Sequence, residues 1–222
     1  MLKNIFEYIK VYNVSKNYTL MPEGYVGVKF KTEMIGNDLP NEDFRLERLK
    51  FWCGVFHERE LAPPYECGGG SYGNLSFRLK DGENGFVITA SQSGLEESTT
   101  TDRFVIVPEV DLRKGIVYAK GLRKPSSESM VHYAIYERRP EIWAVFHGHC
   151  AKITQDAERL GIPITSKEEK YGTIELVERV QEVLDGLCFL EMRNHGFLAL
   201  GKTLDEAGEI ALRFLETTRA SA

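Results

Sequence analysis

The segment Glu141–Cys150, E-I-W-A-V-F-H-G-H-C, decides the fold and the chemistry that this chain can support. Its apolar run predicts a buried strand, and every second residue of a strand points to the same side. We therefore expect His147 and His149 to place their imidazoles on one side of the strand's end. A third histidine, His195, stands in M-R-N-H-G, again between apolar residues and a glycine. Three convergent imidazoles predict a metal site with an open coordination position, which is typical of a catalytic metal.

The segment K-P-S-S-E-S, residues 124–129, predicts the start of a helix that leads into the histidine strand after a short turn. Ser126 and Ser127 lie where hydroxyls cap free backbone amides and where negative charge is favoured. Glu128 lies in the same first turn. Plain capping explains these residues, and so does a functional interpretation, in which a seat for an anion adjoins a general base. The closeness of this helix to the histidine strand favours the second.

Two turns rich in glycine and hydroxyl side chains follow the same logic. Gly73 and Asn74 end the turn C-G-G-G-S-Y-G-N, and Ser93 and Gly94 end T-A-S-Q-S-G at residues 89–94. Glycine lets a ligand approach backbone N–H groups closely, although either segment is also explained as an ordinary turn.

Composition bounds the class of protein. The chain has 222 residues, of which 42% are apolar, enough for one globular core. Its formal charge of −5 offers no global attraction to nucleic acid or to anionic membranes. We find no apolar stretch of membrane-spanning length and no secretory signal at the first residues. The four cysteines have no Cys-x-x-Cys spacing, so we expect neither a zinc knuckle nor a disulfide framework, but a cytoplasmic protein.

The pattern of predicted elements gives the fold class. Helices are expected over residues 41–60, about 124–138, 176–184 and 204–217, and strands over 75–79, 86–89, 104–107, 142–146, 187–192 and 197–200. Such alternation, with hairpins among the strands, predicts an α/β fold: a three-layer α/β/α sandwich around a mixed, largely antiparallel sheet. Residues 1–41 are expected to be an N-terminal extension packing on a catalytic domain of residues 42–222, with a strand at 23–31 along a sheet edge.

One motif is rejected. Residues 196–203, G-F-L-A-L-G-K-T, match the phosphate-binding P-loop pattern. A phosphate cradle needs an open loop, whereas Phe197–Leu200 reads as a strand, and Thr203 with Glu206 forms an ordinary helix-capping box. We also expect His57 and His132 to be helix residues and Cys150 to be a small buried residue.

The order of these motifs resembles the class II aldolase/adducin family over about residues 43–217. The resemblance rests on Ser126-Ser-Glu, His132, Ile135-Tyr136, Arg139-Pro140, His147-Gly-His149, Tyr171-Gly-Thr, His195-Gly196 and Gly201-x-Thr-Leu-x-Glu-Ala. It implies an α/β/α sandwich that assembles as a homotetramer with active sites at subunit interfaces. It also implies that His147, His149 and His195 bind Zn²⁺ or another divalent transition metal, with Glu128 as the catalytic acid/base of the fuculose-phosphate aldolase branch.

The same resemblance places Gly73, Asn74, Ser93, Gly94, Ser126 and Ser127 in the phosphate-binding loops of that branch. The chain also departs from the branch. No tyrosine stands in residues 162–170, where the branch has its proton donor, and residues 89–94 are two residues longer than the family's Thr-Pro-Ser-Gly. Glutamate at position 128, where the family's 4-epimerases carry aspartate, argues against epimerisation.

These expectations give one leading function and two alternatives. The leading one is a zinc-dependent aldehyde-lyase of carbohydrate metabolism that cleaves a ketose, expected to be phosphorylated, into glycerone phosphate and an aldehyde. The first alternative is another metal-dependent lyase of the family, such as a sugar-phosphate dehydratase or a decarboxylase. The second is a non-catalytic assembly module like an adducin head, against which the three histidines argue.

Overall fold

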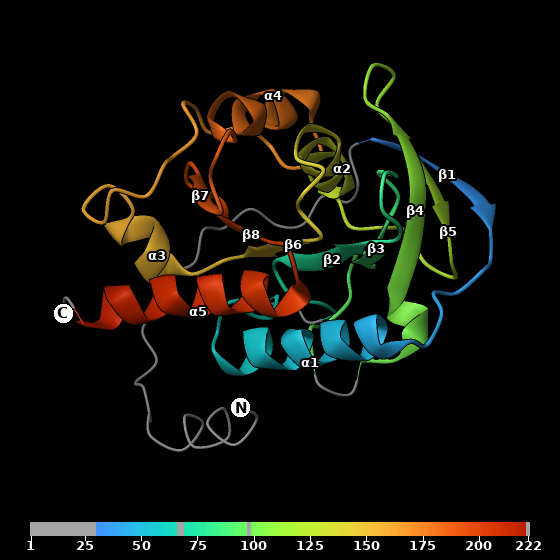
Figure 1. The fold of residues 1–222 in the computed structure, drawn as a ribbon, viewed down its shortest axis with the longest axis horizontal. Helices are drawn as coiled ribbons and strands as arrows, with labels where there is room; N and C mark the ends of the chain where they lie inside the picture. Colours follow the sequence, from blue (N-terminus) through green and yellow to red (C-terminus); the bar gives the residue numbers. More distant parts are fainter. Residues whose placement is uncertain (1–29, 66–68, 97–98, 221–222) are drawn as a thin grey trace.

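The structure is a computed structural model that describes residues 30–65, 69–96 and 99–220. Its centre is an eight-stranded sheet in the order β1-β5-β4-β3-β2-β6-β8-β7 (Figure 1). The strands are β1 (Lys31–Gly36), β2 (Asn74–Arg78), β3 (Phe86–Thr89), β4 (Phe104–Asp111), β5 (Ile116–Lys120), β6 (Ala144–Gly148), β7 (Phe189–Met192) and β8 (Gly196–Gly201). Only the pair β1–β5 is parallel, so within the described residues the sheet is mixed and largely antiparallel, as predicted.

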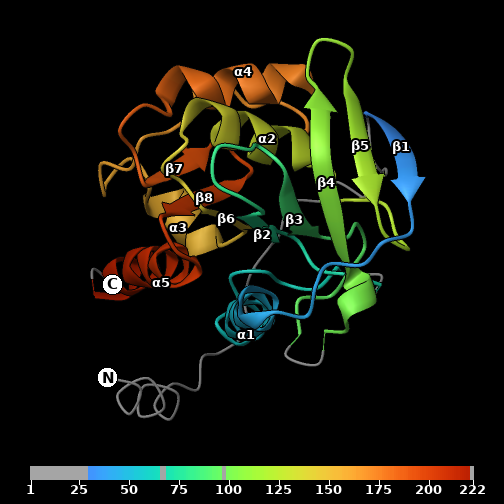
Figure 2. The same cartoon turned by 45° about the vertical axis from the view of Figure 1, so that its right-hand side comes forward.

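Helices cover both faces of the sheet, which confirms the three-layer α/β/α prediction (Figures 1 and 2). They are α1 (Phe44–Glu58), α2 (Ser129–Arg138), α3 (Ala151–Asp156), α4 (Ile174–Val183) and α5 (Leu204–Ala220). Side chains of α1, α3 and α5 pack with Phe146 and other residues on one face. Side chains of α2 and α4 pack with Val145 on the other. Consecutive residues of β6 therefore supply both halves of the core, as the period of a strand requires.

Local sequence explains where several helices begin. Asp43 caps α1 by accepting hydrogen bonds from the backbone amides of Arg45 and Leu46. Thr173 caps α4 in the same way through Leu176. Each cap satisfies amides that have no partner inside their own helix.

Some boundaries differ from the sequence prediction. The strand predicted over 142–146 lies at Ala144–Gly148, so that His147 is inside it. The helix expected from about residue 124 begins only at Ser129, because Pro125 forms a β-bridge with Ala90 that holds the preceding residues extended. The sequence analysis missed β5 and α3.

Three further predictions concern the N-terminal strand, the segment that resembles a P-loop and membrane-spanning helices. The strand expected over 23–31 falls almost wholly outside the described residues, and the edge strand that follows it is β1. Residues Gly196–Gly201 form the fully buried strand β8, which agrees with rejecting a P-loop there. Among the residues that the structure describes, no helix combines the length and apolar character needed to cross a membrane.

Candidate metal centre

Strand β6 brings His147 into the sheet between β2 and β8. His147 is completely buried and lies opposite Asn74 on one side and Leu198 on the other. The Phe197 ring and the Leu61 carbonyl oxygen pack directly against this strand because a glycine follows His147. A Cβ atom on Gly148 would lie 2.4 Å from the Phe197 ring and 2.7 Å from the Leu61 carbonyl oxygen. The motif His-Gly-His therefore combines two histidines with the one residue type that fits between them.

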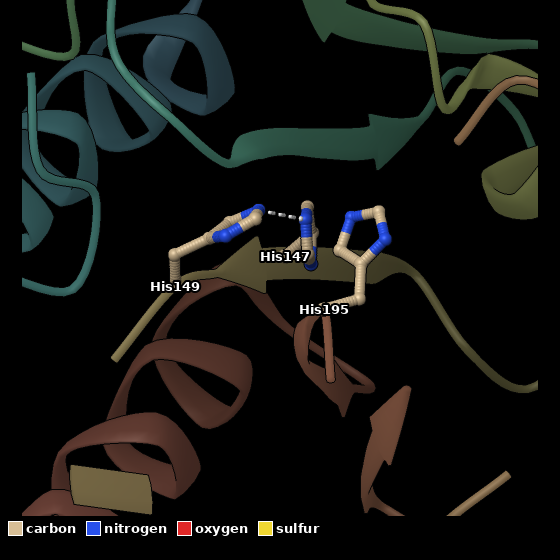
Figure 3. A group of neighbouring side chains, drawn as sticks. All are labelled: His147, His149 and His195. Atoms are coloured by element: carbon tan, nitrogen blue, oxygen red, sulfur yellow. Dashed lines mark hydrogen bonds between the residues drawn. The ribbon is translucent and has the colours of Figure 1, made fainter. Parts of the chain in front are cut away.

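The three predicted histidines meet at the end of β6. Figure 3 shows the rings of His147 and His149 from the end of this strand turned towards His195, which comes from the turn between β7 and β8. The Nε2 atoms of His147 and His149 are 2.9 Å apart, and the ring of His195 is centred 5.1 Å from each of the other two rings. One ring nitrogen from each residue lies within 4.8 Å of the others, an arrangement that can hold one metal ion.

Hydrogen bonding and burial keep the rings of His147 and His149 in the form that can bind a metal ion. The Nδ1 atom of His147 is 2.8 Å from the Phe197 carbonyl oxygen, to which it donates its proton. The Nε2 lone pair of His147 then faces the other imidazoles, as a metal ligand oriented by a backbone carbonyl does. Burial lowers the pKa of His147, and burial with the neighbouring imidazoles lowers the pKa of His149 well below its usual value. Neutral imidazoles are the form that binds metal, so the donor set fits a divalent transition ion.

Glu128 lies against the same nitrogen atoms. It is the residue before α2 and is 4% exposed. Its Oε1 atom is 2.6 Å from His195 Nε2, and its Oε2 atom is 3.1 Å from His147 Nε2. Asn74 Nδ2 donates to Oε2 over 2.6 Å. Burial alone would raise the pKa of Glu128, but the hydrogen bond from His195 and the positive charge of that imidazole when it is protonated outweigh burial and hold the pKa of Glu128 well below its usual value.

A cavity of about 1020 Å³ opens onto this cluster. Among the sequence-predicted residues, its lining includes Gly73, Asn74, Ser126, Ser127, Glu128, His149 and His195. Ser93 and Gly94 do not line it, and Ser91 and Gln92 do. The longer segment at residues 89–94 accounts for the difference, because it turns at Gln92 with a φ of 56°.

The cavity wall also contains tyrosines that the sequence analysis did not assign to the site. The Tyr72 ring lies against the His149 ring, with centroids 5.2 Å apart, and Tyr65 packs edge-on against Tyr72. Tyr65 precedes the glycine-rich turn that carries Gly73, and Tyr72 lies within that turn, which is the only local signal for either tyrosine. Tyr171 lines the cavity as well, although no tyrosine stands in residues 162–170.

A buried acidic residue in contact with the cavity lining was also not predicted from the sequence. Glu191 on β7 is 1% exposed and accepts a hydrogen bond from Thr154 Oγ1 over 2.8 Å, and Thr154 lines the cavity. Burial raises the pKa of Glu191 to about 7. Nothing in the sequence brings Glu191 near residue 154, since the two meet only through the packing of α3 on the sheet.

The sequence of this chain is similar to those of known proteins of one family. A sequence profile described as Class II Aldolase and Adducin N-terminal domain matches residues 59–220. A 5-methylthioribulose-1-phosphate/5-deoxyribulose-1-phosphate aldolase from Rhodospirillum rubrum is 30% identical over 66% of this chain and 69% of its own length. An L-fuculose phosphate aldolase from Methanococcus maripaludis is 31% identical over 70% of this chain and 83% of its own length. A methylthioribulose-1-phosphate dehydratase from Leptospira interrogans is 32% identical over 60% of this chain and 49% of its own length.

Solved structures agree on the fold. An L-fuculose 1-phosphate aldolase superposes with a TM-score of 0.61 at 22% identity, covering 82% of this chain and 88% of its own. The L-fuculose-1-phosphate aldolase from Thermus thermophilus gives a TM-score of 0.60 at 22% identity, covering 80% of this chain and 93% of its own. Because the profile covers most of the sequence and the fold agrees, the chain belongs to the class II aldolase/adducin family.

Proposed function

We propose that the chain is a metal-dependent aldehyde-lyase that cleaves a ketose phosphate into glycerone phosphate and an aldehyde. The observation that carries this proposal is the cluster of His147, His149 and His195 against the ionised carboxylate of Glu128, at the end of a large cavity. Membership of a family whose relatives include sugar-phosphate aldolases supports the substrate class.

The three histidines would hold Zn²⁺ or another divalent transition metal. Such an ion supplies Lewis-acid polarisation of a carbonyl oxygen. Glu128 then has the task of moving a proton at the carbon beside that carbonyl, because its carboxylate lies within 3.1 Å of the same imidazole nitrogens. Asn74 orients the carboxylate through its amide group.

We assign the phosphate group to the cavity-lining residues that adjoin Glu128 and Asn74 in the chain. Ser126 and Ser127 lie just before α2, where free backbone amides and the helix dipole favour an anion. Gly73 lets the chain pass close to β6, since a Cβ atom there would lie 2.6 Å from the His147 carbonyl oxygen. Lys170 adds a cation to the same lining. Ser93 and Gly94 do not line the cavity, so we propose that they support the phosphate site only through their neighbours Ser91 and Gln92.

The experiment is turnover on a panel of ketose phosphates with detection of released glycerone phosphate. We expect Glu128→Gln to lower kcat by about 10²- to 10⁴-fold, the usual contribution of a positioned acid/base. We expect His149→Ala to abolish turnover, because it removes a ligand. The exposed residues His57 and Glu137 provide matched controls, His57→Ala and Glu137→Gln, which should retain full activity. Unchanged rates in Glu128→Gln and His149→Ala would contradict the proposal.

A dehydratase is the second candidate, and the similarity to methylthioribulose-1-phosphate dehydratases favours it. The two reactions differ in their products, because a dehydratase keeps the carbon skeleton and releases water. A product of unchanged carbon number, formed without glycerone phosphate, would select the dehydratase. Metal-free protein with no activity on any sugar phosphate would instead support an adducin-like assembly module.

We propose a cytoplasmic homotetramer whose active sites lie at subunit interfaces, with a small sugar phosphate as its ligand and neither nucleic acid nor membrane as a partner. Residues 1–41 are proposed to pack on a catalytic domain of residues 42–222. Analytical ultracentrifugation of the full chain and of a chain starting at residue 42 would test both the assembly and the extension.

A further inference from the structure

Strand β2 and helix α2 face each other with polar side chains where a core contact is ordinarily apolar. Leu75 and Phe77 of β2 pack on the opposite face, with α1 and α5. The alternate residues of β2 meet one side of α2, on which every fourth residue is polar. We call this set the polar ladder, and it comprises Asn74, Ser76, Arg78, Glu128, His132 and Tyr136. All six residues are at most 4% exposed.

The residues of the polar ladder are evenly spaced because two residues of the strand and four residues of the helix advance by nearly the same distance. Two residues of a strand advance about 6.6 Å, and four residues of a helix advance about 6.0 Å. Asn74 donates to Glu128 over 2.6 Å at one end. At the other end Arg78 Nη2 donates to the Tyr136 carbonyl oxygen over 2.7 Å, and its guanidinium lies 4.8 Å from the centre of the Tyr136 ring.

Ser76 forms the middle of the ladder. Its Oγ atom is 2.7 Å from His132 Nδ1 and 2.8 Å from Tyr136 Oη, so that one hydroxyl joins two turns of α2 to the strand. Burial lowers the pKa of His132 to about 3 and raises the pKa of Tyr136, so both side chains are neutral hydrogen-bonding groups.

Stability alone does not account for these residues. The second ring nitrogen of His132 is buried and has no hydrogen-bond partner among the described residues, which is costly. Apolar side chains of the same volume would fill this contact without that cost. Hydrogen bonds have a feature that apolar packing lacks, since they fix the position of a helix along its own axis.

We propose that Ser76, His132 and Tyr136 are positioning residues that fix α2 along β2 and so hold the Glu128 carboxylate against His147 and His195. The inference rests on the proposed function, in which Glu128 is the group that must be placed. The apolar residues of α2, such as Val131 and Ile135, pack without direction. A shift of α2 along β2 by 1 Å would disturb the 2.6 Å contact between Glu128 and His195, and a misplacement of that size costs about 10²-fold in rate.

The test uses the full chain loaded with Co²⁺, whose visible absorption reports the groups around the ion. Tyr136→Phe removes one hydroxyl and keeps the ring under Arg78, and Ser76→Ala removes the central hydroxyl. We expect each to lower kcat by about 10- to 100-fold with KM within about 3-fold. We also expect each to alter the Co²⁺ spectrum in the direction that Glu128→Gln alters it. Tyr133→Phe, on the same helix but outside the ladder, is the matched control and should change neither readout.

His132 provides a rescue pair. His132→Asn keeps a polar group near the place of Nδ1, whereas His132→Leu fills the volume without one. We expect Asn to retain more of the wild-type kcat and spectrum than Leu. Equal behaviour of the two variants, or wild-type spectra and kcat in Tyr136→Phe and Ser76→Ala despite lower thermal stability, would reduce the ladder to a structural contact and overturn the proposal.

The two proposals fail in different ways. If wild-type protein bound Co²⁺ but turned over no sugar phosphate, the proposed function would fail. The Co²⁺ spectra of the ladder variants would still decide whether the ladder places Glu128. If Glu128→Gln itself left the Co²⁺ spectrum and turnover unchanged, the ladder would have no group to position, and the inference would fall with it.

Discussion

His147 combines full burial, one hydrogen-bonded ring nitrogen and one ring nitrogen that faces two other imidazoles. A histidine in an apolar core ordinarily satisfies both nitrogens or pays for the one left over. Here the Phe197 carbonyl oxygen accepts a hydrogen bond from Nδ1–H and so fixes the tautomer. The residue is therefore specified by its chemistry as much as by its packing, since a leucine would fill the same volume.

Glu191 is a single residue that should make the free energy of unfolding depend on pH. Its pKa of about 7, raised by burial from 4.5, means that the folded state favours the protonated acid. The stability that this group contributes is complete below pH 4.5 and is lost as pH rises towards 7, by on the order of 3 kcal/mol. Glu191→Gln cannot ionise, so we expect its free energy of unfolding to fall less than that of the wild type across this range.

Urea denaturation at pH 4.5, 6 and 8 measures this difference. Glu182→Gln, a change at an exposed carboxyl on α4, is a suitable control. Parallel pH profiles for the wild type and Glu191→Gln would show that Glu191 has no raised pKa in the folded protein.

Sequence could predict the residues whose placement depends on local spacing. His147 and His149 follow from the two-residue period of a strand, and Glu128 follows from the start of a helix. Tyr72 and Glu191 could not be found in this way. Each reaches the cavity through contacts with residues far away in the sequence, and no local pattern encodes such contacts.

At the scale of the element, the packing of the Phe197 ring of β8 against β6 depends on Gly148. A Cβ atom there would lie within 2.7 Å of both the buried Phe197 ring and a backbone oxygen, and neither can move freely. We expect Gly148→Ala to lower the free energy of unfolding by about 1–3 kcal/mol, as overpacking does. Metal affinity should also fall, because the strand that carries two of the histidines has to shift.

Urea denaturation and a zinc-competition titration test this expectation. Gly36→Ala on β1 is the control, because its Cβ atom would approach only side-chain atoms of Asp38 and Lys120, none closer than 3.2 Å. Equal stability and zinc affinity in Gly148→Ala and the wild type would show that the strands have room for a methyl group.

Elements were predictable where a period extends over enough residues. The helices α1, α4 and α5 and the strand β3 follow their apolar patterns closely. Helix α3 has six residues, too few to show a period, and it was missed. The start of α2 was placed too early because the bridge between Pro125 and Ala90 is a tertiary contact.

At the scale of the whole molecule, a bound metal should stabilise the fold, since an ion that binds only the folded state adds RT ln(1 + [L]/Kd). At a hundredfold excess over Kd this is about 2.7 kcal/mol, or a Tm increase of about 5–10 °C for a chain of this size. We therefore expect Zn²⁺ to raise the Tm of chelator-treated protein and a chelator to reverse the effect.

Thermal unfolding of His149→Ala supplies the comparison for this prediction. Loss of one imidazole should remove most of the increase in Tm, whereas His57→Ala, on the outside of α1, should keep it. An increase of the same size in His149→Ala would place the stabilising ion elsewhere in the molecule.

The layers of the molecule were predictable, but the order of its strands was not. Alternation of helices and strands is enough to expect three layers. Strand order depends on which edges pair, and the parallel pairing of β1 with β5 joins residues as far apart in the sequence as Lys31 and Ile116.

The position of β6 has a consequence for how this protein loses activity. It pairs with β2 on one side and β8 on the other, and helices cover both of its faces. Backbone amides in such a strand exchange with solvent water only when the whole domain opens. Fraying of the edge strand β1 thus leaves the imidazole cluster assembled, whereas fraying of the opposite edge strand, β7, displaces the turn that carries His195. Inactivation by heat or denaturant is therefore expected to follow the opening of β7 or of the whole domain.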